Sequence, residues 1–399
     1  MRAKQEQQRA EKAARLGKAQ PKAQKQNETA AKKASQVTKK RHKGADKFDA
    51  NQVQLFAHLQ EYNPTNSDKV RKFLESNQIP SEIIKLGLKY ADGTISGSNA
   101  RSVAMLTTFQ KVIRDYQTPA DKSLHRDLEL YIRPCIDFLS LCRPKSISMG
   151  NSITFLKQRI TRTAEMTEEE AKDYLHEEID SYISERIAVS QFIAEKANTK
   201  IVEGDVVLVY GTSTSVEATL KLAHSSGKRF KVIIVDSRPK FEGRGLLHRL
   251  AAEGLECCYI LLNAISFIMT EVTKVFLGAF AMLTNGNLIS RSGNAVVAMM
   301  AHRFNIPVMV CCETYKFVER GQLDSICFNE VGNPDDLVSG GPTDLKDWRS
   351  MANLKLLNLH YDLTPIEFLT VVITEVGLVP PTSVPVILRE QNSIEAPEQ

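Results

Sequence analysis

The chain has 399 residues, of which 42% are hydrophobic and 25% are charged, and its net charge at pH 7 is +5. This length is enough for two domains that each bury a core, and the composition is typical of a soluble globular protein. No apolar run reaches the roughly 18 residues of a membrane helix, and no apolar stretch follows the first residues as it would in a secretory signal. We therefore expect a cytosolic protein that does not meet a membrane.

The first 47 residues are strongly basic, with 15 Lys and Arg against 4 Asp and Glu, and the rest of the chain is mildly acidic. They are rich in Ala, Gln and Lys and hold no aromatic residue, a composition that buries too little apolar surface to fold alone. We predict a disordered basic arm over residues 1–47. Two roles stay open for it: a solubilising tail, or a segment that binds RNA, ribosomes or an acidic protein. No nucleic-acid motif supports direct nucleic-acid binding.

Residues 48–198 predict a helical domain. Their apolar residues recur at spacings of three and four, as on one face of a helix. Val103 and Leu106 show this pattern in one segment, and Leu175 and Ile179 show it in a later one.

From residue 199 the pattern changes to short apolar runs that alternate with helix-sized segments. Such alternation is typical of a parallel sheet covered on both faces, so residues 199–399 predict a Rossmann-like α/β domain. The predicted strands are 205–210, 230–236, 256–262, 274–279, 306–312 and 355–361. The predicted helices are 216–225, 244–253, 264–272, 293–303 and 364–376. The last helix would have Thr364 at its cap, Pro365 in its first turn and Gly377 at its end.

The seven cysteines form no Cys-x-x-Cys motif. Cys257-Cys258 and Cys311-Cys312 lie within strand-like runs, where neighbouring side chains point to opposite faces of a sheet. We therefore expect reduced, buried thiols and no metal site.

Polar residues follow several of the predicted strands, at the edge where an open parallel sheet binds ligands. They are Thr212, Ser213, Thr214, Ser215, Asp236, Arg238, Glu242, Arg244, Asn285, Asn287 and Glu313. The turn at 212–215 opens a helix, so its hydroxyl and N–H groups suit a phosphate group. Plain capping of the helix explains the same residues equally well.

Two interpretations stay open for Arg238 and Arg244. Their guanidinium groups bind a phosphate or a carboxylate, or they pair with Asp236 and Glu242 in a structural network of charges. We favour the network, because both signs of charge are equally represented.

The order of these segments resembles a known family. An apolar strand ending in Tyr210-Gly211 is followed by Val235-Asp-Ser-Arg-Pro239, Glu242-Gly-Arg244 and Asn285-Gly-Asn287. The same order is found in the methylthioribose-phosphate and ribose-bisphosphate isomerases. It is also found in their relatives, the regulatory subunits of eukaryotic translation initiation factor 2B.

The resemblance also shows which groups of the isomerases this chain lacks. In those enzymes a Cys follows the first strand, and Asp residues stand in a Gly-Ala-Asp and an Asn-Gly-Asp turn. Here the strand runs into Tyr210-Gly211-Thr212, and the two turns read Gly278-Ala279-Phe280 and Asn285-Gly286-Asn287. Removing a proton from a sugar carbon needs a titratable base, so the resemblance implies no catalytic residue. The implied vestigial pocket consists of Thr212, Ser213, Arg238, Glu242, Arg244, Asn285 and Asn287.

Further motifs resemble the delta-subunit branch of the initiation factor family. They are Ser96-Gly-Ser-Asn-Ala-Arg101, Val308–Phe317, Asn333–Leu337, Tyr361–Pro365 and Ile373–Gly377. The resemblance implies a non-catalytic regulatory subunit, without cofactor or metal, of the factor that recharges initiation factor 2 with GTP. Its implied partners are alpha, beta, gamma and epsilon subunits in a two-fold symmetric decamer, and initiation factor 2 with its phosphorylated alpha chain.

The resemblance assigns two sets of interaction residues. The positions that match contacts to the phosphorylated alpha chain are Arg126, Glu185 and Val189. The positions that match the central two-fold interface, where a regulatory ligand bridges two copies, are Phe317, Leu357 and Leu359. Glu185 and Val189 are one helical turn apart and so share a face. From the residues alone, Arg126 and Glu185 are ordinary surface charges and the second set belongs to the core.

Two alternatives from other classes remain. The first is a sugar-phosphate isomerase with an atypical base, for which Glu242, Asp236 and Glu313 are the candidates. The second is a nucleic-acid-binding protein that acts through the basic arm, with an affinity that falls steeply with salt.

Overall fold

The computed structural model describes residues 53–59, 67–119, 121–339, 345, 347–351 and 353–395. The predicted arm over residues 1–47 lies outside the described residues. Val53–Trp348 and Leu356–Gln399 form one compact unit, which is described below, and Arg349–Lys355 are grouped apart from it. Within the described residues, no helix is long and apolar enough to span a membrane.

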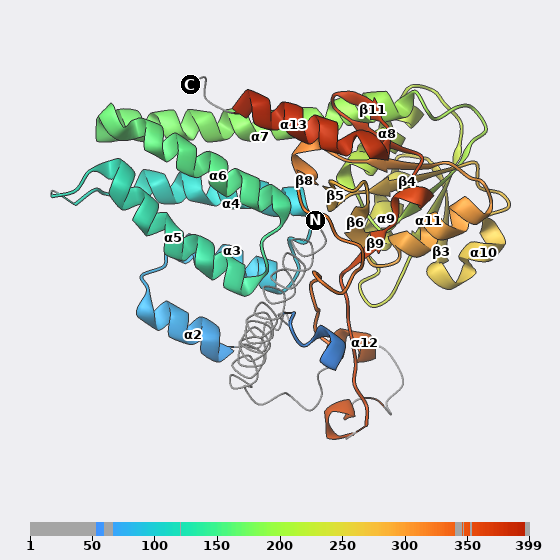
Figure 1. The fold of residues 1–399 in the computed structure, drawn as a ribbon, viewed down its shortest axis with the longest axis horizontal. Helices are drawn as coiled ribbons and strands as arrows, with labels where there is room; N and C mark the ends of the chain where they lie inside the picture. The colour runs from blue at the N-terminus through green and yellow to red at the C-terminus, as the bar shows by residue number, and fades with distance from the viewer. Residues whose placement is uncertain are drawn as a thin grey trace, which may run out of the picture. The chain divides into compact units, whose positions relative to one another are not determined.

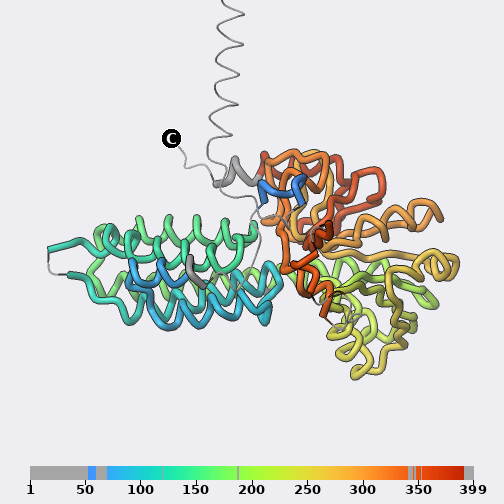
Figure 2. The backbone as a smooth tube through the Cα atoms, turned by 90° about the horizontal axis from the view of Figure 1, so that it is seen from below, coloured from blue at the N-terminus to red at the C-terminus, as the bar shows by residue number. Residues whose placement is uncertain are grey.

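The first half of this unit is helical, and its helices run side by side (Figures 1 and 2). They are α2 (Ser67–Ser76), α3 (Ser81–Ala91), α4 (Ser98–Asp115), α5 (Leu124–Cys142), α6 (Ile147–Arg162) and α7 (Glu168–Asn198). The buried residues recur at helical spacing, as with Met105, Phe109 and Val112 of α4. A reciprocal pair of hydrogen bonds between Thr167 and Glu170 fixes the start of α7.

Helix α7 contributes to two hydrophobic cores. Its first turns bury Leu175 and Ile179 among the other helices. Its last turns bury Ile193 and Ala197 against the sheet of the second half. The helix ends at Asn198, where the sequence predicts a domain boundary. Because the helix packs in the cores of both halves, the division into two domains at this residue stays a prediction.

The second half is built on a seven-stranded sheet with the strand order β11-β10-β7-β4-β1-β2-β3. Its strands are β1 (Val206–Tyr210), β2 (Lys231–Asp236), β3 (Glu256–Leu261), β4 (Lys274–Gly278), β7 (Val308–Cys311), β10 (Val371–Thr374) and β11 (Gly377–Val379). All neighbours are parallel except β10 and β11, which are antiparallel. The predicted α/β fold is confirmed.

Each face of this sheet is buried in its own core. In β1, Val207 and Val209 belong to one core, whereas Leu208 and Tyr210 belong to the other. Burial on both faces explains why these strands are continuous apolar runs. The helices of this half are α8 (Thr214–Ser225), α9 (Gly243–Ala252), α10 (Ile265–Ile268), α11 (Asn294–Arg303), α12 (Asp335–Val338) and α13 (Val384–Glu395).

A second sheet of four short strands has the order β8-β5-β6-β9. Its strands are β5 (Ala281–Leu283), β6 (Leu288–Arg291), β8 (Phe317–Val318) and β9 (Tyr361–Thr364). The predicted strand over 355–361 is wrong, because within it only Leu359 forms an isolated bridge before β9 begins.

The predicted helix over 364–376 is also wrong. Its segment holds a single short turn at Ile366–Phe368 and then the strand β10, which pairs with β7. Val372 and Ile373 are fully buried. This run of β-branched residues therefore forms a strand of the sheet and not the apolar face of a helix. Gly377, with φ of 142°, turns the chain into the antiparallel strand β11 and ends no helix.

Candidate functional site

Two cavities lie beyond the carboxyl ends of the central strands. From β1 the chain proceeds to β2 and β3 on one side and then crosses back to β4 on the other. Ligands of open α/β sheets bind where the order reverses in this way. A cavity of about 360 Å³ occupies this place, between the loops that follow β1 and β4 and the segment Thr94–Ala100. We call it the switch-point cavity.

The turn after β1 contributes Thr212 and Ser213 to this cavity. Ser213 is the N-cap of α8, yet its side chain makes no capping hydrogen bond. Thr212 instead accepts a hydrogen bond of 3.4 Å from Arg249, and Ser215 donates one of 2.9 Å to Glu313. Side-chain capping is therefore not the role of this turn, and phosphate binding by it stays a prediction.

The turn after β4 fills part of the switch-point cavity with an aromatic ring. Phe280 is buried and packs on Tyr361, with 4.2 Å between the ring centroids. Lys316, which also lines the cavity, pairs at 2.7 Å with the fully buried Glu313. Although burial opposes ionisation of Glu313, the ammonium group of Lys316 keeps its pKa below the usual value. A general base works best with a pKa near the working pH, so Glu313 is poorly suited to proton abstraction.

Glu242 is the one carboxylate among the described residues that line the switch-point cavity. Both of its oxygens accept hydrogen bonds of 2.9 Å from Arg291 of β6. Such a bidentate pair fixes the orientation of the carboxylate.

The favoured network among Asp236, Arg238, Glu242 and Arg244 is wrong, because Glu242 pairs with Arg291. Asp236 is buried and accepts hydrogen bonds from the Ser237 backbone N–H and from the Tyr259 hydroxyl. Arg244 lies over the ring of Phe241 at 4.1 Å, and Arg238 makes one long contact of 3.5 Å to the carbonyl of Ser339. Arg291 stands 49 residues from Glu242 in the chain, and we did not predict it.

Asn285 and Asn287 bind backbone instead of lining either cavity. Both side-chain amides donate to the carbonyl of Gln322, at 2.8 and 3.0 Å. The Asn287 carbonyl oxygen accepts a hydrogen bond of 3.0 Å from the N–H of Ile366. The two residues therefore hold loops around the small sheet.

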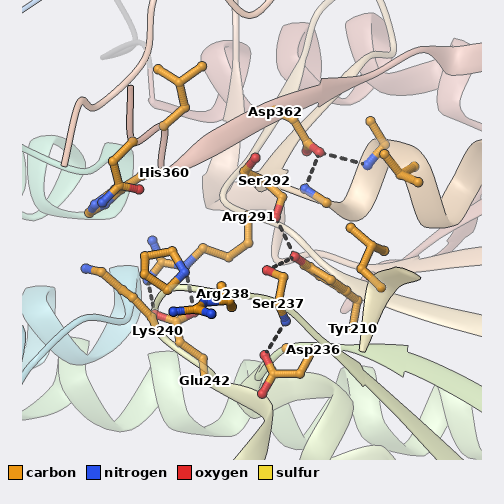
Figure 3. A pocket seen from close by; sticks show the side chains of 18 of the residues that line it. Tyr210, Asp236, Ser237, Arg238, Lys240, Glu242, Arg291, Ser292, His360 and Asp362 are labelled. Atoms are coloured by element: carbon orange, nitrogen blue, oxygen red, sulfur yellow. Dashed lines mark hydrogen bonds and ion pairs between the residues drawn. The ribbon is translucent and has the colours of Figure 1, made fainter. Parts of the chain in front are cut away.

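A second cavity, of about 630 Å³, is also lined by the Glu242–Arg291 pair (Figure 3). Tyr210, Glu242 and Arg291 line both cavities, so the ion pair forms part of the wall between them. The loop after β2 and the segment Leu357–Leu363 supply much of the remaining wall. We call it the β2 cavity.

Asp362 holds the start of α11 at the wall of the β2 cavity. Its Oδ2 accepts hydrogen bonds from the backbone N–H groups of Gly293, at 2.6 Å, and Ala295, at 3.0 Å. Burial raises the pKa of Asp362 to about 6. Burial, followed by the charges of Lys240 and Arg291, lowers the pKa of the nearby His360 to about 2, so this imidazole is neutral.

The raised pKa of Asp362 predicts a pH dependence of stability. The folded carboxyl, with a pKa of about 6, keeps its proton at pH values where the unfolded one, near pH 4, has lost it. The free energy of unfolding should therefore fall as the pH rises from about 4 to about 6. Asp362→Asn stays neutral and keeps an acceptor oxygen, so it should remove this fall. Urea unfolding of both proteins across this range checks the prediction, and a constant difference between them would contradict it.

The positions matched to the alpha-chain contact do not form one cluster within this chain. Arg126 is exposed in the first turn of α5. Its neighbour Asp127 accepts a hydrogen bond from Tyr116, whose carbonyl accepts one from Lys172 near the start of α7. Glu185 follows Lys172 by 13 residues, about 20 Å along a helix. Arg126 and Glu185 therefore lie on separate parts of the surface.

Glu185 is exposed, whereas Val189 is half-buried and packs on the core that contains Ile193 and Ala197. Of these two residues, Glu185 is the one whose whole side chain is accessible to a partner.

The positions matched to the two-fold interface are also separated. Phe317 is buried in one of the two cores of the large sheet, and its backbone pairs with that of Met282 in the small sheet. Leu357 and Leu359 are half-buried and line the β2 cavity.

The comparisons with known proteins agree with this architecture. The model of the Initiation factor 2 subunit family matches residues 94–381. A translation initiation factor eIF2B subunit delta from Dictyostelium discoideum is 51% identical over 348 residues, which are 85% of this chain and 56% of the relative. The chain therefore spans little more than half of that relative's length.

Two further proteins extend the match. An eIF2B subunit delta from Schizosaccharomyces pombe is 45% identical over 358 residues, which are 88% of this chain and 76% of the relative. The crystal structure of the tetrameric eIF2B-beta2-delta2 complex from C. thermophilum contains a chain that is 31% identical, with a TM-score of 0.71 over 82% of this chain and 99% of that one. The chain belongs to the Initiation factor 2 subunit family, on the branch that holds the delta subunits of eIF2B.

Proposed function

We propose that the chain is a non-catalytic regulatory subunit of the guanine-nucleotide exchange factor eIF2B, acting in the cytosol. The observation that carries this proposal is the state of the switch-point cavity. The loop after β4 places the ring of Phe280 in this cavity. Among the described residues, Glu242 is the one carboxylate that lines it, and both of its oxygens are hydrogen-bonded to Arg291. Proton abstraction from a sugar carbon has no free base at this place. The relatives named as eIF2B delta subunits support the same proposal.

In this role the chain assembles with alpha, beta, gamma and epsilon subunits, two of each. The beta–delta complex among the similar structures supports partners of this kind. The test is the native mass and composition of the complex that a tagged copy retains from its own cytosol. Five different subunits in two copies each, with exchange activity on initiation factor 2, are expected. A homodimer that turns over pentose phosphates would instead establish the isomerase alternative.

We further propose that the exposed faces of α5 and α7 take part in sensing the phosphorylated alpha chain of initiation factor 2. Arg126 and Glu185 are exposed on these helices. Arg126 lies next to Asp127, which is linked through Tyr116 to Lys172, and Glu185 follows Lys172 by about 20 Å along α7. They therefore meet different parts of a partner, or two different protein chains, and do not close on one side chain.

Glu185→Lys is expected to weaken inhibition by the phosphorylated alpha chain about tenfold while assembly stays intact, as for one close charge reversed at an interface. Exchange rates measured with phosphorylated and unphosphorylated substrate check this. The matched control is Glu195→Lys, which makes the same exchange at another exposed position of α7. Equal inhibition of the Glu185 variant and the wild type would remove α7 from the sensing surface.

A further inference from the structure

The β2 cavity has a chemistry that the proposed function does not use. Its volume of about 630 Å³ lies in the range of small-molecule sites. It is lined by the loop after β2 and by the start of α11, whereas the switch-point cavity lies between the loops after β1 and β4. Because the Glu242–Arg291 pair stands between them, a ligand in one cavity does not occupy the other.

Two cations on the loop after β2 lack strong partners. Lys240 has no hydrogen bond and no ion pair with any residue that the structure describes, and Arg238 makes only the 3.5 Å contact to Ser339. Figure 3 shows both side chains at the cavity together with Glu242 and Arg291. Desolvation, followed by the charges of Arg143 and Arg291, lowers the pKa of Lys240. A bound anion would relieve this electrostatic cost.

The carboxylates that line the cavity have partners other than Arg238 and Lys240 in the described structure. Glu242 is neutralised by Arg291, and Asp236 and Asp362 accept hydrogen bonds from backbone N–H groups. Hydrogen bonds from neutral N–H groups do not cancel the charge of a carboxylate, but neither Asp236 nor Asp362 forms an ion pair with Arg238 or Lys240 in the described structure. The N–H groups of Arg238 and Lys240 are therefore available to donate charge-assisted hydrogen bonds to the oxygens of a phosphate group.

The rest of the wall suits a flat apolar group with a hydrogen-bond donor. Its apolar side chains include those of Leu262, Val296, Leu337, Leu357, Leu359 and Leu363. Between them, Asp362 presents a buried Oδ1 that has no hydrogen-bond partner in the described part of the chain. The volume far exceeds that of inorganic phosphate, so the anion is one part of a larger molecule.

We propose that the β2 cavity binds an aryl or nucleoside phosphomonoester, with Arg238 and Lys240 on the phosphate and the leucine wall on the ring. An amino or hydroxyl group of the ring system donates to Asp362. This assignment stands on the cavity itself and holds whether or not the chain acts as a regulatory subunit.

Calorimetric titration of the full chain tests the proposal, with AMP and phenyl phosphate as probes. Adenosine and phenol serve as their uncharged counterparts, and inorganic phosphate serves as the anion alone. Both phosphomonoesters are expected to bind more tightly than either counterpart. Lys240→Gln and Arg238→Gln should each weaken this binding about tenfold to a hundredfold, as for the loss of a charge-assisted hydrogen bond.

Two control variants locate the bound probe. Arg244→Gln removes a cation from the start of α9 that does not line the cavity, and it should leave the affinity unchanged. Ser213→Ala changes a residue of the switch-point cavity only, and it should also leave the affinity unchanged. The proposal is overturned if neither phosphomonoester binds at millimolar concentration. It is also overturned if the variants of Arg238 and Lys240 bind as the wild type does, or if binding depends on Ser213.

Discussion

Replacing Glu330 by Gln is expected to destabilise the protein by about 3 kcal/mol or more, as for the loss of one partner from a buried ion pair. Glu330 is 2% exposed and lies between two guanidinium groups that are also buried, those of Arg101 and Arg143. Its Oε2 is 3.5 Å from Nε and Nη2 of Arg143, and its Oε1 is 4.0 Å from Nη2 of Arg101. An amide leaves both cations without a counter-charge in a place that water does not reach.

The effect is large because Glu330, Arg101 and Arg143 (the charge triad) connect the two halves of the chain. Arg101 belongs to α4 and Arg143 follows α5, whereas Glu330 belongs to the second half of the chain, so one carboxylate joins the two halves. Nε and Nη2 of Arg101 have no hydrogen-bond partner in the described structure. Burial, and next the charge of Arg143, lower the pKa of Arg101. The site is therefore already short of negative charge before Glu330 is replaced.

Urea unfolding, followed by circular dichroism, measures the change. The matched control is Glu129→Gln, which removes a carboxylate from an exposed pair with Lys157 at 3.4 Å and should cost less than about 1 kcal/mol. Adding Arg143→Met to the Glu330 variant should recover part of the loss, because one buried cation leaves with the anion. A Glu330 variant as stable as the Glu129 control would show that the triad does not join the two halves.

The central strands could be predicted from the sequence because each is a short apolar run between turn residues. β1, β2 and β3 begin and end within one residue of the predicted ranges. The segment Val371–Thr374 could not be assigned in this way, since a short apolar run is equally compatible with a buried helix. Its pairing with β7 is what makes it a strand, and that contact joins segments that are far apart in the sequence.

The candidate site was predicted in part. Residues that directly follow a strand, such as Thr212 and Arg238, do line the cavities. Arg291 and Asp362 were missed because they belong to β6 and β9, two strands of the small sheet that have only four residues each and so carry a weak sequence pattern. The predicted partners of Glu242 were wrong because Arg238 and Arg244 are its neighbours in the sequence. The fold instead places Arg291, which is 49 residues away in the chain, next to Glu242.

Gly293→Ala is expected to destabilise the protein by about 3 kcal/mol or more, through backbone strain and overpacking together. Gly293 caps α11 with φ of 114°, a conformation that costs free energy in any residue with a Cβ. An added Cβ would lie 2.1 Å from the hydroxyl oxygen of Tyr210. Tyr210 has little freedom to move, because it is buried and its hydroxyl is hydrogen-bonded to Ser237 at 2.6 Å.

The two contributions can be separated by unfolding measurements on a double variant. The new Cβ would meet the hydroxyl oxygen and the ring carbons Cζ and Cε2 of Tyr210, at 2.1, 2.4 and 3.0 Å. Tyr210→Val removes all three atoms and keeps a β-branched residue in β1, so Gly293→Ala should cost less in the Tyr210→Val background than in the wild type. The strain at φ of 114° remains there, so the cost should not vanish. As a control, Gly245→Ala on α9 meets only the end of the Arg249 side chain and should stabilise the helix by about 0.5–1 kcal/mol. Equal costs of Gly293→Ala in both backgrounds would show that the contact with Tyr210 does not contribute and that strain alone demands glycine at the start of α11.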